Sequence, residues 1–592
     1  MNEDIEKLRG DRKLSFKEMA KKAWPYFKPE IGHIILAFII IVFNVIIDAI
    51  LPLIIQYFVD YLQQSPTIIL NTNFIPIISF AIGFLVLSLL NQLFLYCESM
   101  ILQKAGQRVV YHIRYDVFKH IEAMSLDQFS EMPVGSLVTR VANYTSAMSN
   151  LFTSTLVSLI RNSLTIVVIY SVMLYLSWQL SLILTGFVAI VVVASIIFTK
   201  RSGKLFRQER AQLSDFNAYL NESLSGMKIT QLFNQEKRKR DDFEKKNNSL
   251  WKTRYRLIMT FGFYRPIVNL MLYLSLSCIF LFGVNIALSA GTIVAFYLYI
   301  DRFYSPIQEM ADQVRQLQRA LSASERLFNL LDVKPNSTDK EDAISVDHFD
   351  GKIEFKNVWF AYEKENWVLK DISFVINKGD TCAFVGATGA GKTTILSLIV
   401  RNYTPQKGQI LIDDIDISTI KVESLRKAIG QMLQDVFLFS GNIRNNVTLF
   451  DDKFSDEEIN EAVEYVNADK FINRLDEKLD SQVVERGENF SQGQKQLLSF
   501  ARTIIHKPQI LVLDEATANI DTETEVLIQD SLEKMKSIGT MLIVAHRLST
   551  IQKADLIICL QNGKIVENGN HQSLLKNKGY YYNLYKLQFK DS

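Results

Sequence analysis

The run of apolar residues from Gly32 to Phe58 is the feature that most limits what this chain can fold into. It reads GHIILAFIIIVFNVIIDAILPLIIQYF and is longer than the roughly 20 residues needed to cross the hydrocarbon core of a bilayer. The run begins well inside the chain and no small-residue cleavage site follows it, so it does not read as a secretory signal. We therefore expect a membrane-spanning chain whose N-terminal arm stays attached.

Further apolar stretches raise the expected number of spans to about six, which predicts a six-helix α-helical transmembrane domain. The last stretch gives the weakest signal, because it contains Asp301 and Arg302, and charges are costly in lipid. The additional stretches lie near residues 74–96, 155–176, 180–198, 267–287 and 292–306.

The charges of the loops predict which side of the membrane each loop faces. Lysine and arginine accumulate on the cytoplasmic side. They are dense in the N-terminal arm, around residues 104–119 and around residues 200–240, and they are absent from the short connections near residues 60–73, 174–179 and 287–291. We therefore expect both termini in the cytoplasm and the protein in a cell membrane, most simply a bacterial plasma membrane.

The two inner loops are long, about 50 to 60 residues each, and keep apolar residues at helical spacing. Unstructured loops of that length are uncommon. We expect the membrane helices to continue into the cytoplasm and to turn near residues 125–135 and 226–235. Such turns are either solvated hairpins or contact sites for a cytoplasmic domain.

The composition changes after Asp332. A polar segment, KPNSTDKEDAISVDHFD, predicts a linker, and strand-like runs then alternate with helical patterns, as in a soluble α/β domain. We predict four parts along the chain: a cytoplasmic N-terminal arm (1–31), a transmembrane domain with two long intracellular loops (32–330), a linker (331–350) and an α/β domain (351–592).

Charge and cysteine usage exclude other classes of function. The formal net charge is +2, from 65 basic and 63 acidic residues, so no strong field would attract nucleic acid. The four cysteines form no CxxC pair, which argues against a zinc ribbon and a disulfide framework. We expect them to be buried small hydrophobic residues: Cys97, Cys278, Cys382 and Cys559.

A phosphate-binding pattern, GxxxxGK[ST], lies between a predicted strand, TCAFVG, and a predicted helix, TILSLIVRNY. Its glycines let backbone N–H groups approach a polyphosphate, and the helix N-terminus adds its positive end. Lys392 would neutralise the β and γ phosphates, and the Thr393 hydroxyl would bind Mg²⁺. The alternative is a glycine-rich turn that binds nothing. The predicted ATP-binding residues here are Gly386, Ala387, Thr388, Gly389, Ala390, Gly391, Lys392, Thr393 and Thr394.

Two acids, Asp514 and Glu515, end a later apolar strand, ILVLDEA. Carboxylates at the end of a buried strand are costly unless they meet a cation or another polar partner. A metal bound to phosphate supplies such a cation. Asp514 would hold Mg²⁺ through water, and Glu515 would polarise the water that attacks the γ-phosphate.

At this point a resemblance becomes specific, because the segment from Phe490 to Gln494 (FSQGQ) resembles the signature motif of ATP-binding cassette (ABC) proteins. Tyr362 resembles the residue that stacks on adenine, and Gln434 resembles the Q-loop glutamine, which also binds Mg²⁺. His546 resembles the switch histidine, a second catalytic residue that contacts the γ-phosphate. Asp521 resembles the D-loop aspartate at the dimer interface.

The resemblance covers nearly the whole chain, since six spans followed by one cassette is the half-transporter layout of ABC exporters. It implies a multi-domain fold, in which a six-helix transmembrane domain of the ABC exporter type precedes an α/β P-loop nucleotide-binding domain. In this family two cassettes close head to tail around ATP, and closure drives alternating access, so a second half-transporter subunit is implied. The residues expected to contact the partner-bound ATP are Ser491, Gln492, Gly493 and Gln494.

The signature departs from the family consensus LSGGQ, with Phe490 for leucine and Gln492 for the central glycine. A glutamine adds bulk where the backbone should approach the partner's nucleotide. Since Glu515 and His546 are intact, the chain resembles the catalytic-glutamate-bearing subunit of bacterial heterodimeric multidrug ABC exporters. The alternative is a homodimer that tolerates Gln492.

The transported compound is less constrained. Asp48 and Asp301 lie within predicted spans and are candidates to attract an organic cation, so hydrophobic or cationic small molecules are the expected substrates. Membrane lipids are expected partners of the spans. The alternative is an internal ion pair, such as Asp301 with Arg265. A homodimeric lipid or peptide exporter, an ATP-gated channel and a membrane-anchored ATPase sensor are further alternatives, although Glu515 favours a turnover enzyme.

Overall fold

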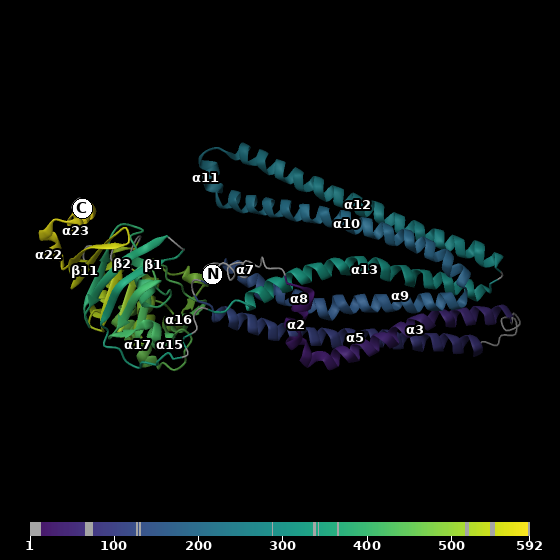
Figure 1. Cartoon of the computed structure of the whole chain (residues 1–592), viewed down its shortest axis with the longest axis horizontal. Helices are drawn as coiled ribbons and strands as arrows, with labels where there is room; N and C mark the ends of the chain where they lie inside the picture. The colour runs from purple at the N-terminus through teal and green to yellow at the C-terminus, as the bar shows by residue number, and fades with distance from the viewer. Residues whose placement is uncertain are drawn as a thin grey trace. The chain divides into compact units, whose positions relative to one another are not determined.

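The computed structural model describes residues 14–64, 75–125, 128–129, 132–286, 288–335, 339–340, 342–363, 366–514, 520–544 and 551–589 (Figure 1). The chain divides into two compact units. One comprises Met1–Glu122 and Met132–Lys334, and the other comprises Ala123–Glu131 and Pro335–Ser592. The first unit is helical, and the second is an α/β unit that also takes in part of the first predicted inner turn.

Long helices form the first unit: α3 (Ile31–Gln64), α5 (Ile75–Glu122), α9 (Leu156–Leu176), α10 (Trp178–Ser225), α12 (Glu236–Asn285) and α13 (Ala290–Leu331). Short elements precede α3 or lead into α9: α2 (Phe16–Phe27), η1 (Lys28–Glu30), α7 (Val134–Thr139), η2 (Arg140–Tyr144), α8 (Thr145–Asn150) and η3 (Leu151–Thr155). The α3 and α5 helices pack together, and α13 packs against both α3 and α9.

Five helical segments in the described part of the chain are long and apolar enough to cross a membrane. They are Lys17–Gln64, Ile75–Glu122, Val134–Leu176, Trp178–Ser225 and Glu236–Asn285. The sixth predicted span lies on α13, which is a continuous helix of 42 residues but does not meet the same hydropathy criterion. The charged side chains of this helix, including Asp301 and Arg302, account for the difference.

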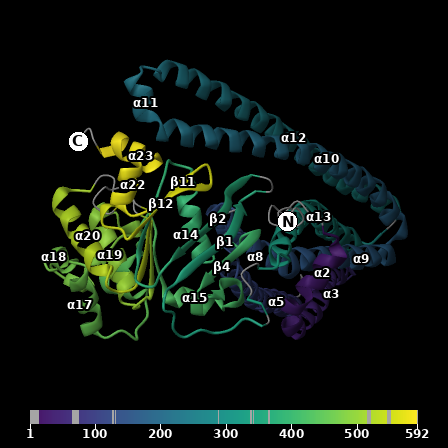
Figure 2. The ribbon, with the colours of Figure 1, turned by 60° about the vertical axis from the view of Figure 1, so that its left-hand side comes forward.

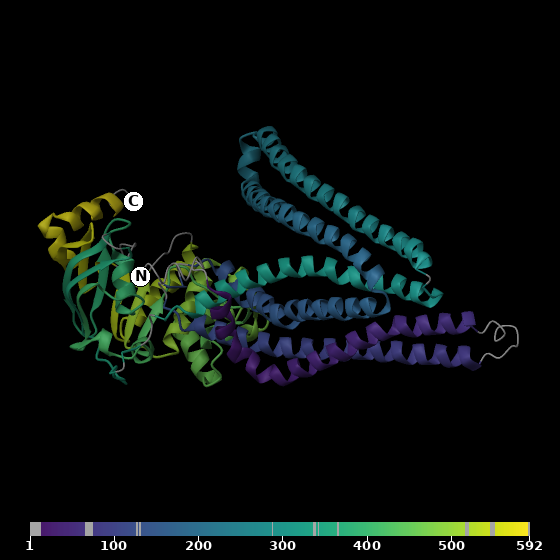
Figure 3. The same cartoon turned by 45° about the vertical axis from the view of Figure 1, so that its right-hand side comes forward.

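The helices continue well past their apolar stretches, as the helical spacing predicts. The α10 helix is 48 residues long and α12 is 50 residues long, whereas a span needs roughly 20. The short helix α11 (Met227–Leu232) joins them, so the second predicted turn is confirmed. Figures 1 and 3 show α10, α11 and α12 as one hairpin, whose α11 end stands apart from the other helices of this unit.

The α/β unit contains a six-stranded sheet in the order β12-β11-β3-β10-β9-β6 and a four-stranded antiparallel sheet in the order β2-β1-β4-β5. A small pair, β7 with β8, is separate. The strands are β1 (Ile353–Ala361), β2 (Trp367–Ile376), β3 (Thr381–Val385), β4 (Lys407–Ile412), β5 (Ile415–Asp416), β6 (Ile429–Met432), β7 (Gly441–Asn442), β8 (Gln482–Val483), β9 (Ile510–Asp514), β10 (Thr540–Val544), β11 (Leu556–Gln561) and β12 (Lys564–Gly569).

The central strands β3, β10, β9 and β6 are parallel neighbours, as is β11 beside β3. Every residue of β3 and β10 is buried, as expected for parallel strands covered on both faces. This double burial explains why their sequences are continuous apolar runs. It also places the carboxyl ends of these strands along one edge of the sheet, where open α/β sheets bind ligands.

Helices surround the sheets, and Figure 2 shows α17 to α20 gathered away from the β1–β2–β4 sheet. The helical elements are α14 (Lys392–Ile399), η4 (Ile417–Thr419), α15 (Val422–Ala428), α16 (Ile443–Thr448), α17 (Asp456–Tyr465), α18 (Asp469–Ile472), η5 (Lys478–Asp480), η6 (Glu485–Gly487), α19 (Gln492–Ile504), α20 (Thr522–Met535), α22 (His571–Asn577) and α23 (Tyr580–Phe589).

Two local expectations need correction. The predicted helix TILSLIVRNY begins earlier and ends at Ile399, because Arg401 adopts a left-handed backbone with φ of 56°. Of the cysteines, Cys382 and Cys559 are buried on β3 and β11, but Cys97 and Cys278 are only half-buried on helices of the first unit. A small apolar side chain on a long membrane helix need not face the interior of its own chain.

Candidate functional site

The loop between β3 and α14 is held in its shape by two glycines that allow close backbone approaches. A Cβ atom on Gly386 would lie 2.3 Å from the Leu560 carbonyl oxygen of β11. Gly391 has φ of 104°, and a Cβ atom there would lie 2.6 Å from Leu369 Cδ2. Side chains at these positions would displace the loop from the sheet, so the glycines fix it at the carboxyl end of β3. Ala387, Thr388, Gly389 and Ala390 lie between them.

The first residue of α14 is Lys392, and its ammonium group curls back over this loop. Its Nζ donates hydrogen bonds to the carbonyl oxygens of Gly386 (2.8 Å) and Ala387 (3.1 Å). Burial lowers the pKa of Lys392, and the negative charge of Asp514 opposes that shift. The loop therefore presents a partly desolvated cation beside the helix N-terminus, which suits the β and γ phosphates of a nucleotide.

The two threonines that follow have different environments. Thr393 is exposed in the first turn of α14, where its hydroxyl is accessible to a metal ion held by phosphate. Thr394 is buried, and its Oγ1 lies 3.1 Å from the hydroxyl of Tyr362. The second threonine therefore anchors the aromatic residue beside the loop.

Tyr362 follows the last residue of β1 and is 48% exposed. Its ring meets Phe360 and Tyr403 edge to face, with centroids 4.9 and 5.1 Å apart. These contacts and the bond to Thr394 hold the ring beside α14. An exposed, immobilised aromatic ring next to a phosphate loop suits stacking on a base.

Gln434 and Asp514 lie at the same edge of the sheet as the loop. Asp514 is the last residue of β9 and is half-buried, and Gln434 follows β6 by two residues and is exposed. The two strands are parallel neighbours, with Met432 opposite Leu513. The structure thus brings an amide and a carboxylate to the edge where Lys392 and Thr393 begin α14.

The predicted catalytic residues Glu515 and His546 lie outside the described residues. Each follows a described strand in sequence. Asp514 ends β9, Val544 ends β10, and these two residues are paired across the parallel sheet.

The signature segment forms a capped helix start. Ser491 is the N-cap of α19, and its Oγ accepts a hydrogen bond from the Gln494 backbone N–H (3.3 Å). The Gln494 side chain accepts one in return from the Ser491 backbone N–H (3.0 Å). Gln492 is the first helical residue and is half-buried. Ser491, Gln492, Gly493 and Gln494 therefore share the first turn of one helix.

Asp521 also caps a helix. Its Oδ2 accepts a hydrogen bond from the Thr524 backbone N–H (2.9 Å) at the start of α20. This bond from Thr524 holds the pKa of Asp521 below its ordinary value. The α20 helix packs against α19, so the predicted D-loop aspartate and the signature segment lie on neighbouring helices.

Sequence reasoning missed Arg502, which joins α19 to the segment after Gln434. Its Nε donates to the Asn446 carbonyl (2.9 Å), its Nη1 to the Phe437 carbonyl (3.0 Å) and its Nη2 to Asn446 Oδ1 (3.2 Å). Asn446 also accepts a bond from the Phe439 backbone N–H (2.8 Å). No motif separates Arg502 from the other arginines, and only the fold brings its partners together.

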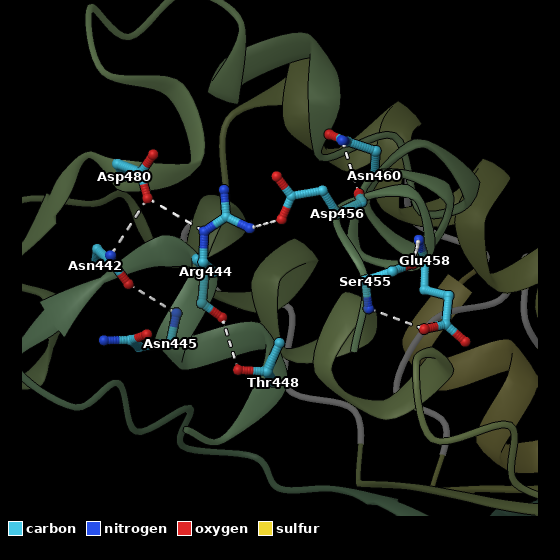
Figure 4. A network of polar contacts seen from close by, with 9 residues as sticks. All are labelled: Asn442, Arg444, Asn445, Thr448, Ser455, Asp456, Glu458, Asn460 and Asp480. Carbon is cyan, nitrogen blue, oxygen red and sulfur yellow. Dashed lines mark hydrogen bonds and ion pairs between the residues drawn. The ribbon is translucent and has the colours of Figure 1, made fainter. Parts of the chain in front are cut away.

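A second polar network lies around α16 and the start of α17 (Figure 4). Arg444 Nε donates to Asp480 Oδ1 at 3.2 Å, and its Nη1 pairs with Asp456. Burial opposes the charge of Arg444, but the two carboxylates outweigh burial and raise its pKa. In the same view Ser455 and Glu458 form the capping box of α17. The network fixes these helix ends to one another.

In the helical unit, the structure gives Asp48 a partner that sequence reasoning did not identify. Asp48 Oδ1 lies 3.1 Å from Arg302 Nη1 and accepts a second bond from Asn91 Nδ2 (3.0 Å). Asp301 is exposed in this chain, and no ion pair between Asp301 and Arg265 is seen among the described residues. A further pair joins Arg161 to Glu98, whose side chain is 1% exposed.

Comparisons with known proteins agree with this arrangement. The family model "ABC transporter transmembrane region" matches residues 34–307, and the model "ABC transporter" matches residues 369–518. The chain is 35% identical over 596 residues to an uncharacterized ABC transporter ATP-binding protein, YfiC, of Bacillus subtilis, with 98% of each chain covered. It is 32% identical over 585 residues to the multidrug resistance-like ATP-binding protein MdlB of Buchnera aphidicola, covering 98% of this chain and 99% of that protein.

A solved structure of a bacterial Atm1-family ABC exporter with ATP bound is also similar. Its TM-score is 0.74 at 26% sequence identity, and the match covers 94% of this chain and 98% of that one. The architecture expected from the sequence, a helical transmembrane domain followed by an α/β nucleotide-binding domain, is therefore confirmed.

Proposed function

The chain belongs to the ABC transporter family as a half-exporter, and from this premise we propose that it is one subunit of a heterodimer that exports amphipathic small molecules. ATP binding and hydrolysis drive the export across the plasma membrane by alternating access. Both termini face the cytoplasm in this proposal, and the cassette, residues 351–592, follows the linker at 331–350. The second subunit is another ABC half-transporter.

In the proposed cycle each predicted site residue has one role. Tyr362 stacks on the base, and Lys392 with the loop N–H groups binds the β and γ phosphates. Glu515 orients and polarises the attacking water, and His546 contacts the γ-phosphate. Hydrolysis adds the oxygen of that water to the γ-phosphorus. The bond between the γ-phosphorus and the oxygen that bridges it to the β-phosphorus breaks, so ADP and phosphate leave.

Thr393, Gln434 and Asp514 would hold Mg²⁺, with Asp514 acting through water. When bound, the ion supplies charge neutralisation at the phosphate oxygens. The donor set fits this ion, because a hydroxyl, an amide oxygen and a carboxylate are the hard oxygen ligands that Mg²⁺ prefers. All three residues border the edge of the sheet described above.

The observation that carries the heterodimer proposal is Gln492 at the first position of α19. Ser491 and Gly493 flank it in a capped helix start, and the other departure from the consensus, Phe490, is buried within the chain, so Gln492 is the departure that would meet a partner's nucleotide. Its bulk weakens the composite site that this signature completes. The other composite site combines this chain's phosphate loop and Glu515 with the partner's signature, and it is the competent one.

The proposed substrate class rests on a relative and on one exposed acid. MdlB, a relative over the full length of the chain, is named for multidrug resistance. Asp48 is neutralised by Arg302 within this chain, so Asp301 is the better candidate to face a cationic substrate. ATP-dependent uptake of a cationic dye into inside-out vesicles, compared between wild type and Asp301→Asn, tests the role of Asp301 in substrate binding.

The deciding experiment measures Mg²⁺-dependent ATPase activity of the purified chain alone, with Glu515→Gln as the background. We expect little turnover from folded, ATP-binding protein, because both composite sites of a dimer of this chain contain Gln492. The Gln492→Gly variant should raise turnover about tenfold or more, since the backbone at that position can then approach the nucleotide.

Robust Glu515-dependent turnover from a defined dimer of the wild-type chain would overturn the heterodimer proposal in favour of a homodimer. A second measurement separates pumping from gating or signalling. ATP-dependent accumulation of substrate in vesicles supports an exporter, and ATPase activity without accumulation contradicts one.

A further inference from the structure

A groove of about 1170 Å³ runs between α10 and α12 on the helical unit. Its walls combine two kinds of side chain. Apolar and aromatic residues include Ile197, Phe198, Met259, Phe263, Tyr264 and Ile267, and the charged residues are Lys200, Arg201, Lys204 and Arg256. None of the described residues that line it is an aspartate or a glutamate. The groove is therefore both apolar and cationic.

Contacts between α10 and α12 show where the groove lies along the helix hairpin. Phe198 stacks on Tyr264, with ring centroids 4.1 Å apart and planes within 10°, and the Tyr264 hydroxyl lies 2.8 Å from Ser195 Oγ. Further along the hairpin, Arg254 Nε bonds to Glu209 Oε1 at 3.1 Å. The groove includes the first of these contacts and ends next to the second, since its lining runs from Ala194 to Gln208 on α10 and from Tyr255 to Ile267 on α12.

At the groove, α10 and α12 each change between apolar and charged residues. On α10 the apolar stretch ends at Phe198, and Lys200 is the first of a series of cations. On α12 the charged segment ends near Arg265, and the apolar stretch begins at Ile267. The groove thus spans the boundary between the hydrocarbon and the cytoplasmic headgroup layer, in the orientation that the loop charges predict.

The cations of the groove are available to a ligand. Lys200, Arg201, Lys204 and Arg256 are all exposed, and none forms an ion pair with another described residue. Glu209, next in sequence to the groove residue Gln208, is already paired with Arg254. The positive charge here is therefore not neutralised by the groove's own surroundings.

We propose that this groove binds an anionic phospholipid of the cytoplasmic leaflet. The phosphodiester lies among the four cations, where arginine donates paired hydrogen bonds and lysine contributes a compact charge. An acyl chain lies along Ile197, Phe263 and Ile267, whose exposed fractions are 60%, 71% and 42%. The volume exceeds the roughly 300 to 1,000 Å³ of small-molecule pockets, in keeping with a lipid.

Two other occupants fit the groove less well. A soluble anion would use only the cationic end and would leave the apolar wall uncovered at the level of the membrane. A helix of a second subunit would have to bring acids to four neighbouring cations. A phospholipid contacts both the apolar and the cationic walls of the groove. Its headgroup lies at the membrane depth where the cationic residues begin.

Native mass spectrometry of the full-length chain in detergent tests the proposal. The probes are dioleoylphosphatidylglycerol and dioleoylphosphatidylcholine at equal concentrations. We compare wild type with a groove variant, Lys200→Gln, Arg201→Gln, Lys204→Gln and Arg256→Gln. The control carries the same charge loss on the same helix hairpin outside the groove: Lys237→Gln, Arg238→Gln, Arg240→Gln and Lys252→Gln.

We expect wild type to bind phosphatidylglycerol in preference to phosphatidylcholine and the groove variant to lose about tenfold or more in phosphatidylglycerol affinity. The control variant should keep wild-type binding. Equal losses in both variants would reduce the effect to general surface charge and overturn the site. If the groove variant does not bind ATP as wild type does, the double variant Lys204→Gln and Arg256→Gln replaces it.

Two further arms separate lipid from the other occupants. Phe263→Ala should weaken phosphatidylglycerol binding, whereas Phe280→Ala, on an exposed part of α12 outside the groove, should not. Excess glycerol 3-phosphate should not displace the lipid, and displacement would identify a soluble-anion site instead. Loss of the dimer in the groove variant, with lipid binding intact, would assign the groove to a subunit contact. None of these outcomes depends on whether the working dimer is a heterodimer.

Discussion

A methyl group on Gly493 would lie 2.4 Å from Thr524 Cγ2, because the start of α19 packs directly on the start of α20. Ile520 Cγ2 would lie 3.0 Å from the same methyl group. The signature segment therefore packs directly against the first turn of α20, the helix that Asp521 caps. A movement of one helix start must be followed by the other.

Gly493→Ala should lower stability and impair ATP turnover of the assembled transporter. Overpacking a tight contact costs about 1 to 3 kcal/mol, which the thermal unfolding of the full chain in detergent would register. Gly203→Ala is the matched control, since a Cβ atom there meets nothing within 4 Å. An unchanged melting temperature for Gly493→Ala would contradict the close packing described here.

Arg502→Lys should disturb the segment that follows Gln434 more than it disturbs folding. Lysine cannot reproduce the forked hydrogen bonds that Arg502 makes to Asn446 and Phe437. The loss is expected to be about 1 to 3 kcal/mol, for bonds from a charged donor. Thermal unfolding and the ATP concentration for half-maximal turnover are the two readouts.

The control for this change is Arg474→Lys, at an exposed arginine whose Nη2 lies 3.3 Å from Glu523 Oε1. Exposed pairs contribute about 1 kcal/mol or less. Equal effects at the two positions would mean that the hydrogen bonds of Arg502 have no special role.

The buried cysteines of the cassette should resist alkylation across the neutral pH range. Burial raises the pKa of Cys559 to about 12 and places the pKa of Cys382 well above its ordinary value, with minor contributions from Glu567 and Asp380. The thiolate is the reactive form, so both groups stay protonated and unreactive from about pH 7 to pH 9.

Iodoacetamide labelling of a chain with Cys97→Ser and Cys278→Ser measures only these two thiols. We expect labelling after denaturation but almost none in the folded protein, with little increase as the pH is raised. Rapid labelling of the folded protein that grows tenfold per pH unit would indicate ordinary thiols near pKa 8.5 and an open core.

Glu98→Gln should destabilise the helical unit, because it removes the buried carboxylate that pairs with Arg161, whose own side chain is 32% exposed. Breaking one side of a fully buried pair costs about 3 to 5 kcal/mol and breaking an exposed pair about 1 kcal/mol or less, so we expect a cost of about 2 to 3 kcal/mol for this half-exposed pair. The double variant Glu98→Gln and Arg161→Met removes the arginine charge as well and should recover part of that loss. Yield of folded protein and unfolding temperature are the measurements.

Glu209→Gln gives the comparison for an accessible pair, since Arg254 is 51% exposed in its side chain. Its cost should stay below about 1 kcal/mol. If Glu98→Gln were as mild, the pair with Arg161 would be solvated rather than buried.

The sequence was sufficient to predict features that depend on neighbouring residues. The pattern from Gly386 to Thr393 predicts its own loop geometry, because glycine spacing and the start of a helix are local properties. The apolar run before Asp514 predicts a fully buried strand for the same reason. The structure bears out both the loop and the strand.

Contacts between distant segments could not be read in this way. Asp48 pairs with Arg302, which is 254 positions away, and the sequence suggested Arg265 as a partner for an acid on the same helix as Arg302. Helix packing decides which of several arginines meets an acid, and the charges alone do not fix that packing. Arg502 was missed because its partners are mostly backbone carbonyls, which every residue has.

The reciprocal hydrogen bonds between Ser491 and Gln494 have a kinetic consequence. The end of α19 that would meet a second cassette is already ordered within one chain, so little conformational entropy is lost when the surfaces meet. Their encounter then needs no folding step and can proceed at the rate of domain motion. In the proposed cycle the nucleotide between the surfaces would then set the lifetime of the closed state, and the two cassettes would part once that nucleotide is hydrolysed.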